Sequence, residues 1–576
     1  MNHFTQYTGR DYSISIEDGK ICLFYRGRRA AAFLPATAVS CVTEQDGEFL
    51  EKEDVEISAE KVECLSDGVF RFRTKSSLWR KEYLLECDPE GFTYRVRVTG
   101  DGAVGKVSYF GGRTEGEPFS GSDYHFCEYY IPCAGTDPAF RQRMPAALPF
   151  RSFFELLIPP PFCFSFRMED IPDGRFGLGL LAADGAYNFI HYDYNTCSCG
   201  KKFGFYLSTD LEGHTKVNGT LELPAIRAFF GKDDLDVIRR YCAYHYDTGL
   251  CRKRDYSDVP RWWRGPIVCG WNEQEAQITE GRSQNGMATQ DVYMKIAGMI
   301  QEKGISPTIL IIDDKWQRAY GDCMPDPEKW PDMRAFTDEM HRRGIHTLLW
   351  FRLWGGEGLP EEEVMPGEGI PYKTVRLNYS PYADPTNENY RSHLKKILYH
   401  LLSSDEGCCN CDGFKLDYSL VMPYGKTAKS AGGQYGTEMT KRLYRLIYET
   451  AKEIKPDALI NGSPCHPYFA EVCDQARLHD YSWACRNETE QMRERAQIFD
   501  AAMPGILIDT DSVNFSDRED AMRFYRAMPE IGIPDIYQFS NDWCFSLSDG
   551  DWEEIRNIFN EYSAKTNAAW GSPDKT

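Results

Sequence analysis

The sequence predicts an N-terminal β-sandwich followed by a (β/α)₈ barrel. Short runs that alternate apolar and polar residues fill residues 1–232, and apolar runs alternate with helical patterns across residues 261–576. These two observations separate an all-β part from an α/β part. The chain has 576 residues, which is too long for one ordinary domain, and its 42% hydrophobic content can supply more than one core.

Residues 1–232 carry the period of two that a half-buried strand requires. Tyr12–Ile16, Val69–Phe72 and Phe92–Val98 each alternate between apolar and polar side chains. Gly, Asp and Pro interrupt such runs at short intervals, which is typical of turns between antiparallel strands. This part is therefore expected to be a β-sandwich.

The periodicity changes near residue 233. Residues 233–260 are expected to form a connecting helix and linker, and residues 261–576 the barrel. Val292, Ile296 and Ile300 have helical spacing, and similar patterns separate the apolar runs. Eight strands joined by helices predict the barrel. The expected strands lie near 266–271, 307–313, 345–351, 411–417, 457–462, 475–481, 505–510 and 534–539.

Composition excludes several classes of partner. The formal net charge of −21 argues against nucleic acid and anionic membrane surfaces, because phosphate binding needs clustered Lys and Arg. No apolar run is long enough to span a bilayer, and residues 1–7 show no signal-peptide pattern. Twenty cysteines without such a signal favour reduced thiols and a cytoplasmic location. A carbohydrate substrate is the expected partner, and the sequence leaves a homo-oligomer open.

Polar and aromatic side chains gather where the predicted barrel strands end. Burying an unpaired carboxylate is costly, so carboxylates at the ends of buried strands suit a site at the C-terminal rim. One such Asp is often only a helix N-cap, but several carboxylates, Lys and Arg side chains and several Trp on one rim favour an active site. The residues in question are Trp271, Asp313, Asp314, Trp316, Trp350, Arg352, Trp354, Lys415, Asp417, Arg477, His479, Asp480, Asp509 and Asp511.

Lys415 and Asp417 stand two residues apart, so on a strand they point to the same side. An ammonium beside a carboxylate keeps it ionised, as a nucleophile requires. Two carboxylates with a cation and aromatic rings suit cleavage of a glycosidic bond. Metal-assisted hydrolysis also uses carboxylates, but the chain has no HxH or HExxH pattern, and Cys408–Cys411 is too tightly spaced for zinc. No metal and no cofactor are expected.

Three motifs carry a resemblance to a known family. Ile312–Gln317 is similar to an Asp-Asp-Gly-Trp motif, Gly344–Phe351 to Gly-x-x-x-Gly-Leu-Trp, and Phe414–Asp417 to Lys-Trp-Asp. The barrel half thereby resembles glycoside hydrolases of clan D, nearest to family 36, the α-galactosidase or melibiase type. The resemblance covers residues 260–545 by motif and the rest by architecture.

The resemblance implies roles for individual residues. Asp417 would be the nucleophile, and Asp480 the acid/base. Asp313 and Asp314 would bind hydroxyls of the terminal sugar, and Arg477 would orient Asp480 or bind a hydroxyl. The remaining expected substrate-binding residues are Lys415, Arg352 and the pocket walls Trp271, Trp316 and Trp350.

The chain departs from the family pattern at two motifs. Lys315 stands where the family has Gly after the Asp pair, and Asn461–His466 replaces a Cys-x-x-Gly-Gly segment. A C-terminal sandwich is also missing. These departures bear on the identity of the sugar more than on the reaction.

The resulting prediction is a retaining exo-α-glycosidase acting on terminal α-linked galactose-type residues. Two alternatives stay open. One is another α-glycosidase of the clan, either an α-N-acetylgalactosaminidase or a transglycosylase. The other is a catalytically inactive carbohydrate-binding protein on the same scaffold, against which the presence of both Asp417 and Asp480 argues.

Overall fold

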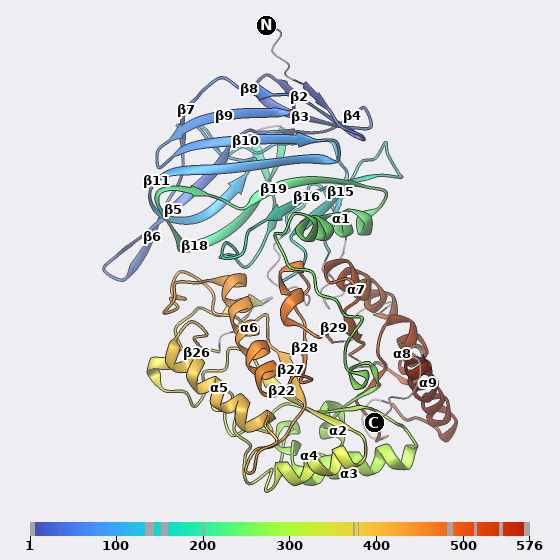
Figure 1. The fold of residues 1–576 in the computed structure, drawn as a ribbon. Helices are drawn as coiled ribbons and strands as arrows, with labels where there is room; N and C mark the ends of the chain where they lie inside the picture. The colour runs from blue at the N-terminus through green and yellow to red at the C-terminus, as the bar shows by residue number, and fades with distance from the viewer. Residues whose placement is uncertain are drawn as a thin grey trace.

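The structure is a computed structural model of the whole chain. It describes residues 6–132, 143–150, 159–199, 202–372, 375–377, 379–480, 488–511, 515–540 and 545–568. A β-rich N-terminal region, blue to green in Figure 1, stacks on a barrel whose strands and helices run from green to red. Among the described residues, no helix is both long and apolar enough to span a membrane.

Two antiparallel sheets form the N-terminal region. The smaller sheet has the order β1-β2-β3-β4-β12. Its strands are β1 Gln6–Thr8, β2 Tyr12–Glu17, β3 Lys20–Tyr25, β4 Arg28–Phe33 and β12 Asp123–Tyr124. The strands of the larger sheet are β5 Thr37–Gln45, β6 Glu48–Lys52, β7 Glu56–Ala59, β8 Glu63–Ser66, β9 Val69–Ser76, β10 Arg80–Asp88, β11 Gly91–Tyr109, β13 Glu128–Tyr130, β14 Arg143–Pro145, β15 Cys163–Arg167, β16 Arg175–Leu181, β17 Asp193–Cys199, β18 Lys202–Glu222 and β19 Ala225–Gly231.

Aromatic side chains join the two sheets. Tyr12 on β2 stacks on Phe230 on β19 with ring centroids 4.9 Å apart, and Phe33 on β4 meets Phe92 on β11 edge-on at 6.0 Å. All four rings are buried. Contacts of this kind bury the inner faces of both sheets, so the predicted β-sandwich is confirmed.

Helix α1 (Asp234–Asp247) follows the last sandwich strand and packs against both β16 and barrel helix α7 (Glu488–Ala502). Asp233 caps it by accepting a hydrogen bond from Asp236 N. On β16, a Cβ at Gly179 would lie 2.3 Å from the Tyr241 ring. Glycine at this position therefore lets the helix approach the sheet closely.

The second region is a parallel barrel in the described residues. Its strand order is β30-β29-β28-β27-β22-β21-β20-β31, every pair is parallel, and a parallel bridge between Asp509 and Ile533 lies where the two ends of the sheet meet. The predicted (β/α)₈ barrel is confirmed. The strands are β20 Ile267–Cys269, β21 Ile309–Ile312, β22 His346–Arg352, β27 Gly413–Asp417, β28 Leu459–Gly462, β29 Gln475–Arg477, β30 Leu507–Asp509 and β31 Asp535–Ile536.

Helices surround this sheet. They are α2 Trp271–Ala276, α3 Gln290–Lys303, α4 Met333–Arg342, α5 Glu388–Leu402, α6 Gly436–Ile454, α7, α8 Arg518–Ile531 and α9 Asp549–Ala568, with the short 3₁₀ helices η1 Arg261–Arg264, η2 Gln284–Met287, η3 Glu361–Glu363 and η4 Pro467–Val472. Two small hairpins, β23 Val364–Met365 with β26 Tyr382–Ala383 and β24 Ile370–Tyr372 with β25 Val375–Leu377, lie between β22 and α5. The α3 helix ends at Gly304, whose φ of +67° is the left-handed cap that its sequence predicts.

Most barrel strands are shorter than predicted, and the sixth is the one whose shortening bears on the site. The sixth barrel strand was expected over 475–481, but β29 ends at Arg477. His479 has a φ of +67°, so the chain turns out of the sheet at this residue. Residue 481 lies outside the described residues. The turn matters because it carries Asp480, the predicted acid/base.

Candidate active site

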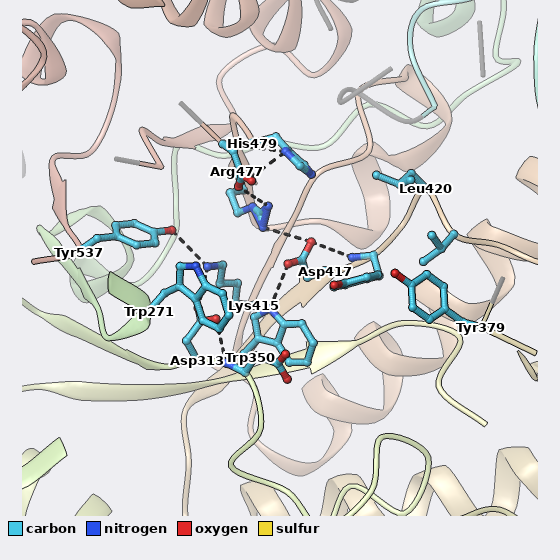
Figure 2. Close-up of a pocket in the computed structure, with 14 residues that line it drawn as sticks. Trp271, Asp313, Trp350, Tyr379, Lys415, Asp417, Leu420, Arg477, His479 and Tyr537 are labelled. Atoms are coloured by element: carbon cyan, nitrogen blue, oxygen red, sulfur yellow. Dashed lines mark hydrogen bonds and ion pairs between the residues drawn. The ribbon is translucent and has the colours of Figure 1, made fainter. Parts of the chain in front are cut away.

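A cavity of about 390 Å³ opens at the C-terminal ends of the barrel strands. Eight of the ten predicted site residues line it. Figure 2 labels six of them, which converge from different elements of the barrel: Trp271, Asp313, Trp350, Lys415, Asp417 and Arg477. The lining residues are Trp271, Asp313, Asp314, Trp350, Tyr379, Lys415, Asp417, Tyr418, Leu420, Val421, Arg477, His479, Asp480 and Tyr537. A cavity of this size at this face is where barrel proteins place their ligands.

Asp417 ends β27 and is held on three sides. Trp350 Nε1 donates to its Oδ2 at 3.0 Å, the Tyr418 backbone N–H donates to its Oδ1 at 2.7 Å, and Arg477 Nη1 lies 3.3 Å from Oδ1. Burial alone would raise the pKa of this carboxyl, but the Arg477 charge and the backbone N–H outweigh it and hold the pKa well below its usual range. Asp417 is therefore an ionised carboxylate facing the cavity.

Asp480 shares the same guanidinium. Arg477 Nη2 lies 3.5 Å from Asp480 Oδ1, and 47% of the Asp480 side chain remains exposed in the cavity. Enclosure by the surrounding protein raises the pKa of the Asp480 carboxyl, opposed by Arg477 and supported by the negative charge of Asp417. The two predicted catalytic carboxyls thus have pKa values displaced in opposite directions.

Arg477 is the cation that organises these carboxyls. It is 2% exposed, and its Nε lies 3.2 Å from a third carboxylate, Asp511. Asp511 also accepts a hydrogen bond from Tyr537 OH. A buried guanidinium among three carboxylates fixes their relative positions, since its planar donors leave little freedom.

Lys415 does not have the partner that its sequence position predicts. Its Nζ donates to Asp313 Oδ2 at 2.8 Å, and it lies 3.2 Å from Tyr537 OH, whereas Arg477 is the ion partner of Asp417. Lys415 does share a face with Asp417, and its charge also lowers the pKa of Asp417, after the larger effect of Arg477. Asp313 is within reach of Lys415 because only β22 separates β21 from β27.

The Asp313–Asp314 pair lies where β21 ends. The backbone N–H of Asp314 donates to Asp313 Oδ1 at 2.8 Å, so the chain turns between the two residues and both face the cavity. Asp314 is 8% exposed, accepts from Tyr320 OH at 3.2 Å through Oδ2, and has no hydrogen-bond partner at Oδ1. Burial and the neighbouring Asp313 raise the pKa of Asp314 to about 7.

Lys315, which stands where the family has Gly, adopts the left-handed conformation that favours Gly, with a φ of +74°. Its Nζ lies 3.9 Å from the Tyr320 ring centroid and 3.4 Å from Glu357 Oε2. The residue is absent from the cavity lining. This substitution therefore leaves the wall of the cavity to other side chains.

His479 contributes a neutral imidazole. Burial, helped by the charge of Arg477, lowers the pKa of His479 to about 3. Its Nδ1 accepts a hydrogen bond from the Asp480 backbone N–H at 3.0 Å. Because Nδ1 accepts, the neutral ring carries its proton on Nε2.

Two predicted pocket residues do not line the cavity. Trp316 is fully buried and donates through Nε1 to the Trp350 carbonyl at 2.8 Å, so it supports a wall residue from behind. The Arg352 guanidinium carbon lies 4.1 Å from the Tyr379 ring centroid and 4.8 Å from that of Tyr418. It packs behind two wall tyrosines. Trp354, which the sequence places on the same rim, is 2% exposed and does not line the cavity.

Several residues that line the cavity were not predicted from the sequence. Tyr537 lies within the eighth predicted strand, so its strand position could have found it. Tyr418 directly follows Asp417 and has a left-handed φ of +63°, so strand alternation would have placed it on the wrong face. Tyr379, Leu420 and Val421 come from segments between the strands, where no periodic signal marks them. Their placement depends on how these segments fold over the rim.

One group of side chains in the described part of the chain could hold a metal ion, and it lies at the other end of the barrel. The ligand atoms of His341, His346 and Asp412 are within 4.8 Å of one another. His346 begins β22 and Asp412 precedes β27, whereas the cavity lies where these strands end. The Lys455 ammonium is already 3.2 Å from Asp412, which offsets the charge that a cation would need.

No protein-family model matches the chain. A curated relative, the A type blood α-D-galactosamine galactosaminidase of Flavonifractor plautii, is 28% identical over 221 residues. That match covers 34% of this chain and 19% of the relative, so the matched segment is about a fifth of the relative's length.

Solved structures match nearly the whole chain. The cycloalternan-forming enzyme of Listeria monocytogenes has a TM-score of 0.57 at 12% identity, covering 97% of this chain and 63% of that one. The α-galactosidase of Lactobacillus brevis has a TM-score of 0.51 at 11% identity, covering 97% and 83%. The chain therefore shares its fold with an α-galactosidase and with a cycloalternan-forming enzyme. The cycloalternan-degrading enzyme of Trueperella pyogenes, solved with a covalent intermediate, matches with a TM-score of 0.52 at 13% identity over 98% of this chain and 83% of that one.

Proposed function

We propose that this protein is a retaining exo-α-glycosidase that removes terminal α-linked galactose-type residues. The observation that carries the proposal is the pair Asp417 and Asp480 on the two terminal nitrogens of Arg477. One carboxyl has a pKa held far down and the other a pKa raised, which matches a nucleophile and an acid.

The shared guanidinium also supports retention. Retaining glycosidases hold their two carboxyls about 5–5.5 Å apart, whereas inverting enzymes leave about 6.5–9.5 Å for a water molecule. Two carboxyls side by side on one planar fork favour the shorter separation. The cycloalternan-degrading enzyme with the same fold has been solved with a covalent intermediate, in keeping with covalent catalysis on this fold.

The proposed chemistry has two steps. Asp417 attacks the anomeric carbon while the bond to the leaving oxygen breaks, and Asp480 gives that oxygen its proton. In the second step Asp480 takes a proton from water, whose oxygen attacks the anomeric carbon and releases Asp417. Trp350 Nε1 and the Tyr418 N–H keep Asp417 aligned throughout.

Asp314 supports the preference for a galactose-type sugar. Its buried Oδ1 has no hydrogen-bond partner and belongs to a lining residue, so a sugar hydroxyl can satisfy it. Such a charge-assisted bond discriminates between epimers, because the wrong epimer leaves a buried carboxylate unpaired. An α-galactosidase shares the fold, and the curated relative acts on a galactosamine, according to its name.

A galactosamine is the second candidate substrate. Four carboxyls line the cavity, Asp313, Asp314, Asp417 and Asp480, against two cations, Lys415 and Arg477. With Asp480 protonated as the acid, three carboxylates face two cations once Asp314 ionises, and this surplus negative charge attracts a sugar that carries an ammonium group. The name of the curated relative points the same way.

A screen of nitrophenyl α-glycosides tests the proposal. We expect turnover of the α-galactoside or the α-galactosaminide, with little on the α-glucoside or α-xyloside. Proton NMR of the first sugar released should show the α-anomer. Equal rates on the galactoside and glucoside would overturn the sugar assignment, a β-anomer would overturn retention, and no turnover of any α-glycoside would overturn the activity.

A further inference from the structure

Arg495 lies directly behind the turn that carries Asp480. It belongs to α7 and is 1% exposed. Its Nη1 lies 3.2 Å from the Leu478 carbonyl oxygen, 2.9 Å from that of His479 and 3.1 Å from that of Asp480. Three consecutive carbonyl oxygens thus converge on one guanidinium nitrogen.

This convergence depends on a special backbone conformation. Along a strand, successive carbonyls point in opposite directions, so three in a row cannot share one donor. The left-handed φ of +67° at His479 breaks that alternation. A non-glycine residue keeps such a conformation only where the surroundings hold it, and left-handed residues concentrate at functional sites. The hydrogen bonds that Arg495 donates to the three carbonyls hold the turn in this conformation.

We propose that Arg495 is a positioning residue, which fixes the Leu478–Asp480 turn and thereby sets the Asp480 carboxyl on Arg477 opposite Asp417. The proposal rests on the proposed glycosidase function. A buried cation must be compensated by hydrogen bonds, and the three carbonyls contribute to that compensation. Removal of Arg495 would free the turn, and the Asp480 carboxyl would lose its fixed distance to the leaving oxygen.

The charge of Arg495 also affects the protonation of the groups on this turn. It is among the groups that lower the pKa of both His479 and Asp480, after the larger effects of burial and Arg477. Loss of this charge should therefore move the pKa of Asp480 further up, in addition to the loss of position.

The test compares Arg495→Met and Arg495→Lys with Arg493→Met, a matched control on the same helix. Arg493 lies nearer the surface, and its Nη1 pairs with Glu530 at 2.9 Å. Each variant is assayed on an α-glycoside with a dinitrophenol leaving group, which needs no proton, and on an alkyl α-glycoside, which does. A misplaced acid predicts a fall in kcat/KM of about 100-fold or more on the alkyl glycoside and below about 10-fold on the dinitrophenyl glycoside.

Arg495→Lys should recover much of the loss, because an ammonium has three donors for the three carbonyls. Arg493→Met should leave both rates near the wild type. Equal losses of Arg495→Met on the two substrates, or no loss beyond that of Arg493→Met, would overturn the inference while the wild-type activity stands. A wild-type protein that cleaves no α-glycoside would overturn the proposed function, and this inference with it.

Discussion

Replacement of Asp314 by Asn should raise the stability of the folded protein and lower its activity. The Asp314 carboxyl is buried beside Asp313, and its Oδ1 lacks a hydrogen-bond partner. Asn keeps the shape and can still accept from Tyr320 OH, but it removes the negative charge. The variant should therefore relieve an unfavourable buried charge and lose the group that binds a sugar hydroxyl.

The size of the stability gain follows from the pKa. Burial raises the pKa of Asp314 from 3.8 to about 7, and each unit is worth about 1.4 kcal/mol. Because the folded pKa lies above the unfolded one, the folded protein keeps a proton that the unfolded chain loses between about pH 4 and 7. The wild type is thus destabilised progressively as pH rises through that window. Asp314→Asn should be more stable by about 2–4 kcal/mol at pH 8 and by almost nothing at pH 4.

Thermal unfolding at pH 4, 6 and 8 measures this difference. The midpoint of Asp314→Asn should exceed that of the wild type by a few degrees at pH 8 and converge with it at pH 4. At pH 8 its kcat/KM should fall about 100-fold or more, since a charged hydrogen bond to the sugar is gone. Asp258→Asn, at an exposed position, is the control. A pH-independent difference, or a lower midpoint at pH 8, would refute the reasoning.

The remaining predictions concern the two groups that define the nucleophile. Arg477→Met should raise the pKa of Asp417, because a charge pair near 4 Å is worth about 4 kcal/mol at an effective dielectric of 20, or about three pKa units. The acid limb of the kcat/KM profile should therefore move to higher pH. Arg477→Lys keeps a positive charge and should move this limb less. An unchanged acid limb in folded Arg477→Met would contradict the assigned ion pair. Asp417→Gly should lose turnover without unfolding, and azide should restore release of the activated leaving group with formation of a glycosyl azide. Unaltered turnover in that variant would exclude Asp417 as the nucleophile.

The sequence predicted those parts of the site that depend on one strand at a time. Asp313 and Asp417 each end or follow a buried apolar run, and Arg477 lies in a predicted strand, so parallel strands had to bring them to one rim. A turn between Asp313 and Asp314 is also required if both bind one sugar, since two neighbours on a strand cannot face one cavity.

The sequence could not predict which side chains pair with one another between different barrel strands. Arg477 pairs with Asp417 across sixty residues of chain, whereas the sequence argument used Lys415, only two residues away. Trp316 has the spacing of a pocket wall but packs into the core, because its indole finds the Trp350 carbonyl there. The early end of β29 depends on the left-handed His479, and no residue type in that segment marks it.

Covalent trapping of the nucleophile tests the central claim most directly. A fluorinated α-galactosyl fluoride slows the second step of a retaining reaction more than the first, so the glycosyl-enzyme accumulates. We predict one added sugar per chain, found by mass spectrometry on the peptide that contains Asp417, and no adduct in Asp417→Gly. An adduct on Asp480 or another residue, or full turnover with no adduct at any time, would contradict the account.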